Sequence, residues 1–306
     1  MPGLPFATPL DLHGWAGNKR AMASPLSRRD PSSAAPAEPR KETAGSLLRF
    51  ILGAAILAWA LRSFILQPFY IPSGSMLPTL YIGDYLVVAK WPYGYSRYSF
   101  PFGVPRFNGR VLENLPKRGD VVVFRHPDED ADLVKRVIGL PGDTVEVRNG
   151  RLVLNGRLAT RVPLGPAKVE VSDNSPCRVV PPATPIVAAV HDRTYCLYSS
   201  FLETLPGGPS YTVLNQLDHG PADDFPTVKV PAGHVFLMGD NRDDSLDSRF
   251  PGYEGGIGMV PTENLIGHPL VTFWSTDGSA SWVKPWTWFT ALRWDRIGNG
   301  YTGAAE

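Results

Sequence analysis

The chain has 306 residues, with 30 Lys and Arg against 29 Asp and Glu, so its formal net charge is +1. This balance excludes the strongly basic character typical of proteins that bind nucleic acid through charge, and the length allows one or two domains. Glycine and proline are abundant, at 30 and 31 residues. Because both interrupt helices and favour turns, the composition predicts short strands rather than a helical bundle.

The N-terminal region divides into a polar tail and an apolar segment. Residues 1–45 are rich in proline, alanine, serine and charge, which predicts a disordered tail. The segment 46–66 is long and apolar enough to cross a membrane as one helix, with Arg49 and Arg62 near its ends, where long side chains reach the headgroups. The first 49 residues carry seven Lys and Arg against four acids. The positive-inside rule therefore predicts a cytoplasmic tail and a single-pass protein whose remainder lies outside.

A cleavable signal peptide is the alternative interpretation of this segment. Ala58-Trp59-Ala60 follows a short apolar run and is similar to a small-residue cleavage site. However, the preceding segment is very long for the n-region of such a peptide, and apolar residues resume at Phe64–Leu66. We therefore expect an uncleaved anchor.

After Pro72 the sequence changes to short β-like runs bounded by Gly, Pro, Asp and Asn. The predicted strands are Tyr85–Val88, Val121–Phe124, Leu133–Ile138, Thr144–Val147, Leu152–Leu154, Thr227–Val230, His234–Met238 and Leu270–Phe273. Asn149-Gly150 suits the turn of a hairpin between two of them. We expect a mainly β protein in which 67–154 and 225–306 form the two halves of one antiparallel core, and 155–224 forms a smaller, β-rich inserted subdomain.

Two further patterns concern cysteine and tryptophan. Cys177 and Cys196 lie 19 residues apart, without the paired spacing of a zinc site, and outside the cytosol they could form one disulfide. Two unpaired buried thiols are the alternative. Residues 274–294 hold five tryptophans, a residue that favours the membrane–water interface. This stretch is therefore either a surface that rests on lipid or a set of ordinary core and strand aromatics. These tryptophans are Trp274, Trp282, Trp286, Trp288 and Trp294.

Ser75 is the candidate nucleophile, in the run Ile71-Pro-Ser-Gly-Ser-Met-Leu-Pro78, nine residues beyond the apolar segment. A serine hydroxyl needs a base that takes its proton. The sequence contains no G-x-S-x-G motif, and its histidines occur without a triad signature. These are His13, His126, His191, His219, His234 and His268.

Lysine is the other candidate base. Lys135 interrupts an apolar strand next to Arg136, and neighbouring strand residues face opposite sides, so one of the two is expected to point inward. Burial lowers the pKa of a lysine, and a fall of about three units corresponds to roughly 4 kcal/mol. An exposed strand lysine is the ordinary alternative. Lys90 is a rival base, although it ends its strand beside Trp91-Pro92 and is expected to be solvated.

The third segment of interest is Gly239-Asp-Asn-Arg-Asp-Asp-Ser-Leu-Asp-Ser-Arg249, in which six of eleven residues are charged. A solvated loop is one interpretation. The alternation of both signs directly after an apolar strand also suits a hydrogen-bonded turn that supports an active site, with Asp247 and Arg249 as an ion pair.

Together these three segments resemble bacterial type I signal peptidase (leader peptidase), a family of serine–lysine membrane proteases. The resemblance extends from about Phe64 to Arg296 and rests on Ile71–Leu80, on Lys117–Phe124 with Val134–Asp143, and on Gly239–Arg249. It implies a membrane-anchored endopeptidase that removes signal peptides from exported preproteins after small residues at −1 and −3. The protein would lie in the bacterial inner membrane, with its catalytic part on the outer, periplasmic face.

The resemblance also implies a role for individual residues. Ser75 would be the nucleophile, Lys135 the general base, and Ser73 together with the Ser75 backbone N–H the oxyanion hole. Ser245, Asp247 and Arg249 would support the dyad. The substrate-binding positions would be Phe69, Ile71, Pro72, Met76, Leu86, Val123 and Val134. No metal or other cofactor is expected, and the expected partners are secretory preproteins leaving the export machinery and the lipid bilayer, not nucleic acid.

The chain departs from the family pattern at Asp244, where many relatives have Asn, and at His268-Pro269. Two other functions remain as alternatives. An autoprotease of the SOS-repressor type would have no need of the apolar segment. A membrane-anchored β domain that only binds partners would leave Ser75 and Lys135 without a chemical role, and a serine-reactive probe would distinguish it.

Overall fold

The computed structural model describes residues 44–281 and 283–301. The expected disordered tail therefore lies outside the described residues except for its last two positions, and so does Trp282. The helices are α1 (Ala44–Phe64) and α2 (Thr287–Thr290), together with short 3-10 turns. The strands in this part of the chain are β1 (Leu66–Tyr70), β2 (Asp84–Ala89), β3 (Val121–Arg125), β4 (Asp132–Gly139), β5 (Thr144–Arg148), β6 (Arg151–Leu154), β7 (Arg157–Leu158), β8 (Thr160–Pro163), β9 (Ala167–Glu170), β10 (Ile186–Val190), β11 (Arg193–Thr204), β12 (Ser210–Asn215), β13 (Phe225–Lys229), β14 (His234–Met238), β15 (Val260–Pro261) and β16 (Leu265–Ser275).

Helix α1 is the only helix among the described residues that is long and apolar enough to cross a membrane. Its large apolar side chains, from Phe50 to Phe64, are exposed. The helix ends at Phe64, two residues earlier than predicted, because Pro68 cannot continue a helix and holds the residue before it in an extended conformation. The Tyr95 hydroxyl donates a hydrogen bond to the Phe64 carbonyl at 2.9 Å, which ties the end of the helix to the loop beyond β2.

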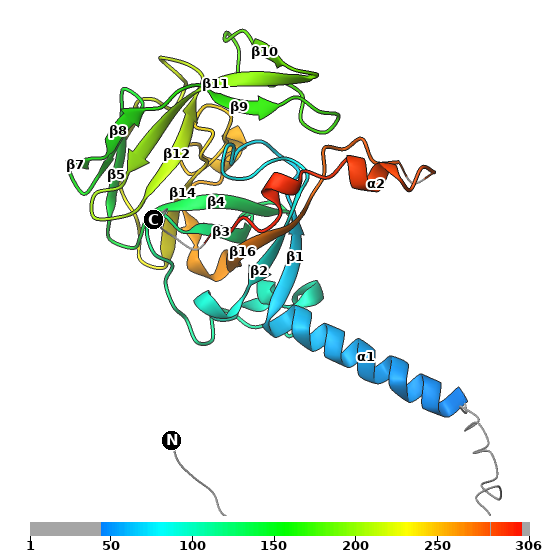
Figure 1. Ribbon diagram of the computed structural model, residues 1–306. Helices are drawn as coiled ribbons and strands as arrows, with labels where there is room; N and C mark the ends of the chain where they lie inside the picture. The colour runs from blue at the N-terminus through cyan, green and yellow to red at the C-terminus, as the bar shows by residue number, and fades with distance from the viewer. Residues whose placement is uncertain (1–43, 282, 302–306) are drawn as a thin grey trace, which may run out of the picture. The chain divides into compact units, whose positions relative to one another are not determined.

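The main sheet contains β4, the strand of the candidate base Lys135, and its neighbour β3. Its strand order is β1-β2-β16-β3-β4-β14-β15, and the paired strands run antiparallel (Figure 1). In this register Lys135 of β4 lies opposite Val122 of β3, and Arg136 lies opposite both Val121 of β3 and Met238 of β14. The β-branched and aromatic residues of β3 suit a strand with neighbours on both edges.

Two smaller sheets complete the β structure of the described chain. Strands β5, β6, β7 and β13 form one of them, and Asn149 and Gly150 make the predicted β5–β6 turn with φ of 48° and 70°. In the other, β11 pairs with β8, β9, β10 and β12, all between residues 160 and 215. The segment predicted as an inserted subdomain thus has a sheet of its own, more regular than its Pro-rich sequence suggested.

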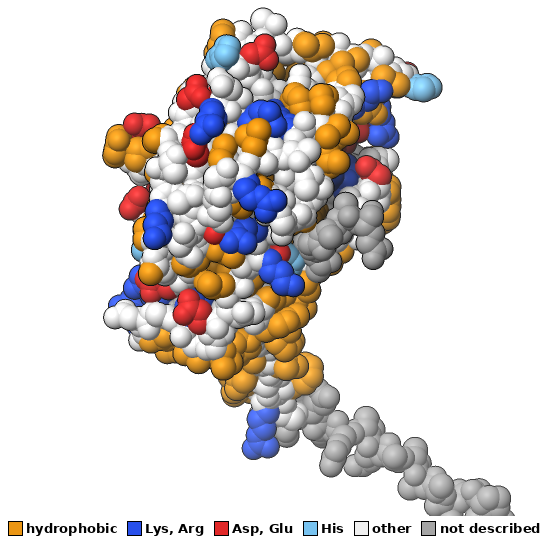
Figure 2. All heavy atoms as spheres, turned by 90° about the vertical axis from the view of Figure 1, so that its left-hand side faces the viewer, with side chains coloured by type: hydrophobic (Ala, Val, Ile, Leu, Met, Phe, Trp, Pro, Cys, Tyr) orange, Lys and Arg blue, Asp and Glu red, His pale blue; other side chains and the backbone are white. Residues whose placement is uncertain are grey.

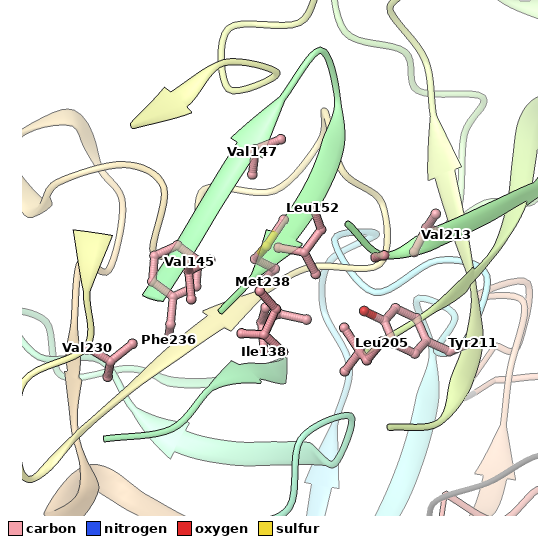
Figure 3. Packing of buried hydrophobic residues seen from close by; sticks show 12 residues of the cluster. Ile138, Val145, Val147, Leu152, Leu205, Tyr211, Val213, Val230, Phe236 and Met238 are labelled. Carbon is pink, nitrogen blue, oxygen red and sulfur yellow. The ribbon is translucent and has the colours of Figure 1, made fainter. Parts of the chain in front are cut away.

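A hydrophobic core joins this inserted sheet to the rest of the protein. Ile138 of β4, Val145 of β5 and Phe236 of β14 belong to one buried cluster with Tyr211 and Val213 of β12, and their side chains converge from several strands in Figure 3. The insertion therefore packs directly on the strands that hold Lys135. On the face shown in Figure 2, acidic and basic side chains are interspersed and neither sign dominates.

Candidate active site

Ser75 lies on the loop between β1 and β2, and backbone hydrogen bonds fix its position. The Asn241 backbone N–H donates to the Ser75 carbonyl, and Asn241 Nδ2 donates to the Gly74 carbonyl, both at 3.1 Å. Gln216 Nε2 in turn donates to Asn241 Oδ1 at 2.9 Å. Asn241 was not predicted as a functional residue, although it lies in the charged segment that the sequence singled out. Two loops that are far apart in the sequence are thereby held together at the nucleophile.

The structure brings Ser75 and Lys135 into direct contact. Lys135 Nζ donates a hydrogen bond to Ser75 Oγ at 2.6 Å, across 60 positions of sequence. The Lys135 residue is only 4 % exposed. At this distance a neutral amine can instead accept the hydroxyl proton, so the pair has the geometry of a nucleophile and its base.

The surroundings of Lys135 favour the neutral amine that a base requires. Burial lowers the pKa of Lys135 from its ordinary value of 10.5 to about 8, while the nearby Asp247 carboxylate opposes this shift. The neutral amine is therefore present in a larger fraction of the molecules near neutral pH than for an ordinary lysine. Burial is therefore what prepares this lysine for proton transfer near neutral pH.

Ser73 lies next to the nucleophile on the same loop. Its Oγ is 3.5 Å from Ser75 Oγ, and the residue is exposed. Within the described chain no acceptor takes a hydrogen bond from the Ser75 backbone N–H. A hydroxyl and an amide are thus available near the point where a tetrahedral oxyanion would form.

The loop 239–249 supports this arrangement through a buried ion pair. Arg249 Nε and Nη2 donate to the two Asp247 carboxylate oxygens, each at 2.9 Å, as the sequence suggested. The Gly239 backbone N–H also donates to Asp247, at 3.0 Å. Burial acts to raise the pKa of Asp247, but the Arg249 guanidinium outweighs it and holds this pKa below its usual range. A Cβ at Gly239 would overlap both the Ser75 carbonyl oxygen and the Ser245 hydroxyl, so only glycine fits there.

Ser245 does not form the contact that was expected of it. Its side chain lines the same cleft as Lys135, but its buried Oγ has no hydrogen-bond partner among the described residues. The predicted bond to the Lys135 amine is therefore absent from this structure. The Lys135 amine is oriented by Ser75 Oγ instead.

Arg136 faces away from Lys135 and is held by a second buried ion pair that the sequence did not reveal. Its guanidinium donates to the Asp240 carboxylate at 2.7 and 2.6 Å, and Thr79 Oγ1 donates to the same carboxylate at 2.5 Å. The guanidinium also stacks on the Tyr211 ring at 4.1 Å. This pair joins β4, the nucleophile loop and the inserted sheet.

A small cavity of about 30 Å³ adjoins Ser75 and Lys135. Of the seven predicted substrate-binding residues, five line it, namely Phe69, Ile71, Pro72, Met76 and Val134. The other two, Leu86 and Val123, are not among its lining residues; they are 0 % and 1 % exposed and lie in the apolar cluster behind the lining. Asp132 and Leu133 also line the cavity and were not predicted, although they directly precede Val134 in the sequence.

Ser75 also lines a larger cleft of about 550 Å³, and residues 178–181 form part of the wall of this cleft. The neighbouring Cys177 is joined to Cys196 of β11 by a disulfide, with Cα atoms 5.3 Å apart. The unpaired-thiol alternative does not apply to this structure. His126 also lines the cleft, but its Nδ1 accepts hydrogen bonds from the backbone of Asp128 and Glu129, so this nitrogen is already occupied.

Residues 44–281 and 283–301 contain no group of three or more His, Cys, Asp or Glu side chains that could hold a metal ion.

The described tryptophans of the C-terminal stretch are all exposed: Trp274, Trp286, Trp288 and Trp294 range from 39 % to 66 %. They are therefore not core residues, although Trp274 is a strand aromatic of β16.

Comparison with known proteins agrees with this geometry. The family model described as signal peptidase, peptidase S26, matches residues 44–274. A signal peptidase I from Rickettsia massiliae is 34 % identical over 84 % of this chain and 91 % of its own length. A signal peptidase I from Rickettsia rickettsii is 34 % identical over 81 % of this chain and 88 % of its own.

A solved structure shows a more distant similarity. The crystal structure of a signal peptidase I from Enterococcus faecalis V583 covers 51 % of this chain and 97 % of its own, at 25 % identity and a TM-score of 0.27. Because such a score indicates little overall superposition, the family assignment rests on the sequence matches. By those matches the chain belongs to the signal peptidase family, peptidase S26, whose members are serine peptidases, and it is an enzyme that hydrolyses peptide bonds.

Proposed function

We propose that this protein is a membrane-anchored signal peptidase I that removes N-terminal signal peptides from exported preproteins with a Ser75–Lys135 dyad. The observation that supports it best is the 2.6 Å contact between Ser75 Oγ and a buried lysine amine. The relatives named signal peptidase I supply the substrate class. Asp247 and Arg249 hold the supporting loop through their buried ion pair, and the buried Ser245 hydroxyl beside it has no partner among the described residues.

The reaction begins with proton transfer between the dyad residues. Neutral Lys135 accepts the Ser75 hydroxyl proton as Oγ attacks the carbonyl carbon of the scissile bond. The oxyanion accepts hydrogen bonds from the Ser73 hydroxyl and the Ser75 N–H. When the C–N bond breaks, the Lys135 ammonium returns its proton to the leaving amine. Lys135, neutral again, then takes a proton from a water that attacks the acyl-enzyme. As this second tetrahedral intermediate collapses, the Lys135 ammonium gives the proton to the departing Ser75 Oγ, which releases the product acid and restores both residues.

The small cavity supports the part of the proposed preference for small residues at −1 and −3 that concerns the −1 residue. Its volume of about 30 Å³ and its apolar lining suit a methyl-sized side chain and exclude bulky ones. Ile71 and Met76 form the part of this lining that continues into the buried cluster below. The same apolar residues keep water from Lys135, so one set of side chains serves both specificity and the lowered pKa.

We place the protein in the bacterial inner membrane, with its N-terminus in the cytoplasm and its catalytic part on the periplasmic face. The seven Lys and Arg among the first 49 residues, against four acids, support this orientation. Helix α1 is the proposed anchor, and β1 begins two residues after it ends. Ser75 would then act close to the membrane surface, on preproteins leaving the export machinery, and the exposed tryptophans would face lipid headgroups.

The proposal is tested by cleavage of a preprotein with an Ala-x-Ala site by the purified, detergent-solubilised full chain. Wild type is compared with Ser75→Ala and Lys135→Ala, each checked for folding by circular dichroism and thermal unfolding. We expect cleavage by wild type alone, at the predicted bond by mass spectrometry. Normal cleavage by folded Lys135→Ala would contradict the dyad, and no cleavage by folded wild type would contradict the function.

A further inference from the structure

The two cavities at the active site meet at the nucleophile. The small apolar cavity and the 550 Å³ cleft share Ser73, Ser75, Leu133 and Lys135. A polypeptide whose −1 side chain occupies the small cavity has its scissile carbonyl at Ser75. Its next residues must continue beyond Ser75, and the larger cleft is the described space beside the dyad that can hold them. On the basis of the proposed function, we infer that this cleft binds the first residues of the mature protein and that Arg178 sets its preference for their charge.

Arg178–Pro181 forms one wall of the cleft. This segment belongs to the connection between β9 and β10 of the inserted sheet. Three contacts hold it in place. The disulfide of Cys177 fixes its start, the Tyr198 hydroxyl donates to the Arg178 carbonyl at 2.8 Å, and the Val180 N–H donates to Gln216 Oε1 at 2.9 Å. Gln216 is the residue that also binds Asn241, so the wall is connected to the backbone of the nucleophile loop.

Arg178 extends from this wall to the catalytic loop. Its guanidinium forms an ion pair with Asp244, at 3.0 Å, next to Ser245. The Asp244 side chain is 11 % exposed, whereas that of Arg178 is 72 % exposed. The carboxylate is thus buried under the arginine, and the arginine remains accessible to a bound polypeptide.

The charges in the cleft are unevenly distributed. Glu129, Asp243 and Asp244 supply three carboxylates, and Arg178 supplies the cation that opposes them once Lys135 is neutral. Asp243 accepts hydrogen bonds from the backbone of Gln216 and Leu217 and is therefore fixed at the wall. Removal of Arg178 would leave three carboxylates with less opposing positive charge, which favours a cationic mature segment and disfavours an anionic one.

Two substrates that differ only after the cleavage site test this inference. Both carry the same signal peptide with an Ala-x-Ala site, and positions +2 to +4 are three glutamates in one and three lysines in the other. The measurement is the ratio of kcat/KM for the Lys substrate to kcat/KM for the Glu substrate. We expect Arg178→Ala to raise this ratio about two- to fivefold, the size expected for partly exposed charges in contact. Asp244→Asn should lower it.

The matched control is Arg193→Ala. Arg193 pairs with Glu170 at 3.0 Å, its side chain is 65 % exposed, and it lies on β11 of the same sheet, but it does not line the cleft. Its removal should leave the ratio unchanged. An Arg178→Ala ratio equal to those of wild type and Arg193→Ala would overturn the inference while leaving the peptidase intact. If wild type cleaves neither substrate, both this inference and the proposed function are wrong.

Discussion

Lys135 and Lys90 are two buried lysines with similar electrostatics and different surroundings. They are 4 % and 1 % exposed, and burial lowers the pKa of each from 10.5 to about 8. The amine of Lys135 meets the hydroxyl of Ser75, whereas the amine of Lys90 donates a short hydrogen bond to the Ser99 carbonyl. A carbonyl has no proton to give. A lowered pKa therefore makes a base only where burial coincides with a proton donor.

The largest expected effect separates the two lysines by activity and stability. Lys135→Ala should reduce kcat/KM by at least about 10⁴-fold, as the loss of one member of a catalytic dyad does. Lys90→Ala should keep kcat/KM within about threefold and lower the free energy of unfolding by about 2–4 kcal/mol, because it leaves a cavity and an unpaired Ser99 carbonyl. Cleavage assays and urea unfolding of the same preparations measure both. Loss of activity in folded Lys90→Ala would reverse the assignment.

A second experiment tests Ser73, the oxyanion donor proposed beside Ser75 and Lys135. The Ser73 hydroxyl lies beside Ser75 Oγ, so Ser73→Ala should lower kcat by roughly 10²–10³-fold, the usual cost of one oxyanion donor. Thermal unfolding should change little, because the side chain is exposed. Ser73→Thr keeps the hydroxyl and should retain much of the rate. A wild-type kcat for Ser73→Ala would remove Ser73 from the oxyanion hole.

The pH profile shows which lysine titrates in catalysis. Because the base must be neutral, kcat/KM should rise with pH through about 8. The Asp244 carboxylate raises the pKa of Lys135, so Asp244→Asn should move the midpoint to lower pH. The Asp132 carboxylate raises the pKa of Lys90 instead, so Asp132→Asn should leave the midpoint where it is. A downward shift for Asp132→Asn alone would point to Lys90.

The smallest expected effect concerns two buried serines on the loop beside Lys135. Ser245 Oγ has no partner, so Ser245→Ala should change the free energy of unfolding by less than about 1 kcal/mol. Ser248 Oγ accepts a hydrogen bond from the Leu237 N–H at 2.9 Å, so Ser248→Ala should cost about 1–3 kcal/mol. Urea unfolding compares the two. Equal losses would mean that Ser245 has a partner this structure lacks.

The sequence was sufficient for much of the main sheet and for the dyad. Strand β14 has the predicted bounds, β3 and β5 extend one residue further at one end, and β4 extends one residue further at each end. The agreement is close because their apolar runs are strongly β-forming and bounded by turn residues. The motif around Ser75 and the cation within an apolar strand made Ser75 and Lys135 candidates, and the resemblance of the three segments to a known family selected them over an exposed strand lysine. Both are local signals, readable without knowledge of the tertiary structure.

The other features of the site were not predicted, because they arise from contacts between segments that are distant in the sequence. The pairs Arg136–Asp240 and Arg178–Asp244 join residues more than 60 positions apart, and neither residue of a pair indicates its partner. Leu86 and Val123 are apolar strand residues like Val134, and only the packing shows that they lie behind the cavity rather than on it. Strand order and layer depth decide such contacts, and neither follows from residue spacing.

The Cys177–Cys196 disulfide has a consequence for when the enzyme matures. Such a bond forms in oxidising compartments and is rare in the cytosol. In the proposed orientation, a newly made chain would reach the far side of the membrane with two thiols and acquire the bond only there. The segment that carries Arg178 would be fastened at that moment. Completion of the substrate cleft would then follow the enzyme's own export, so a chain that failed to cross would remain an unfinished protease among cytosolic proteins it should not cut.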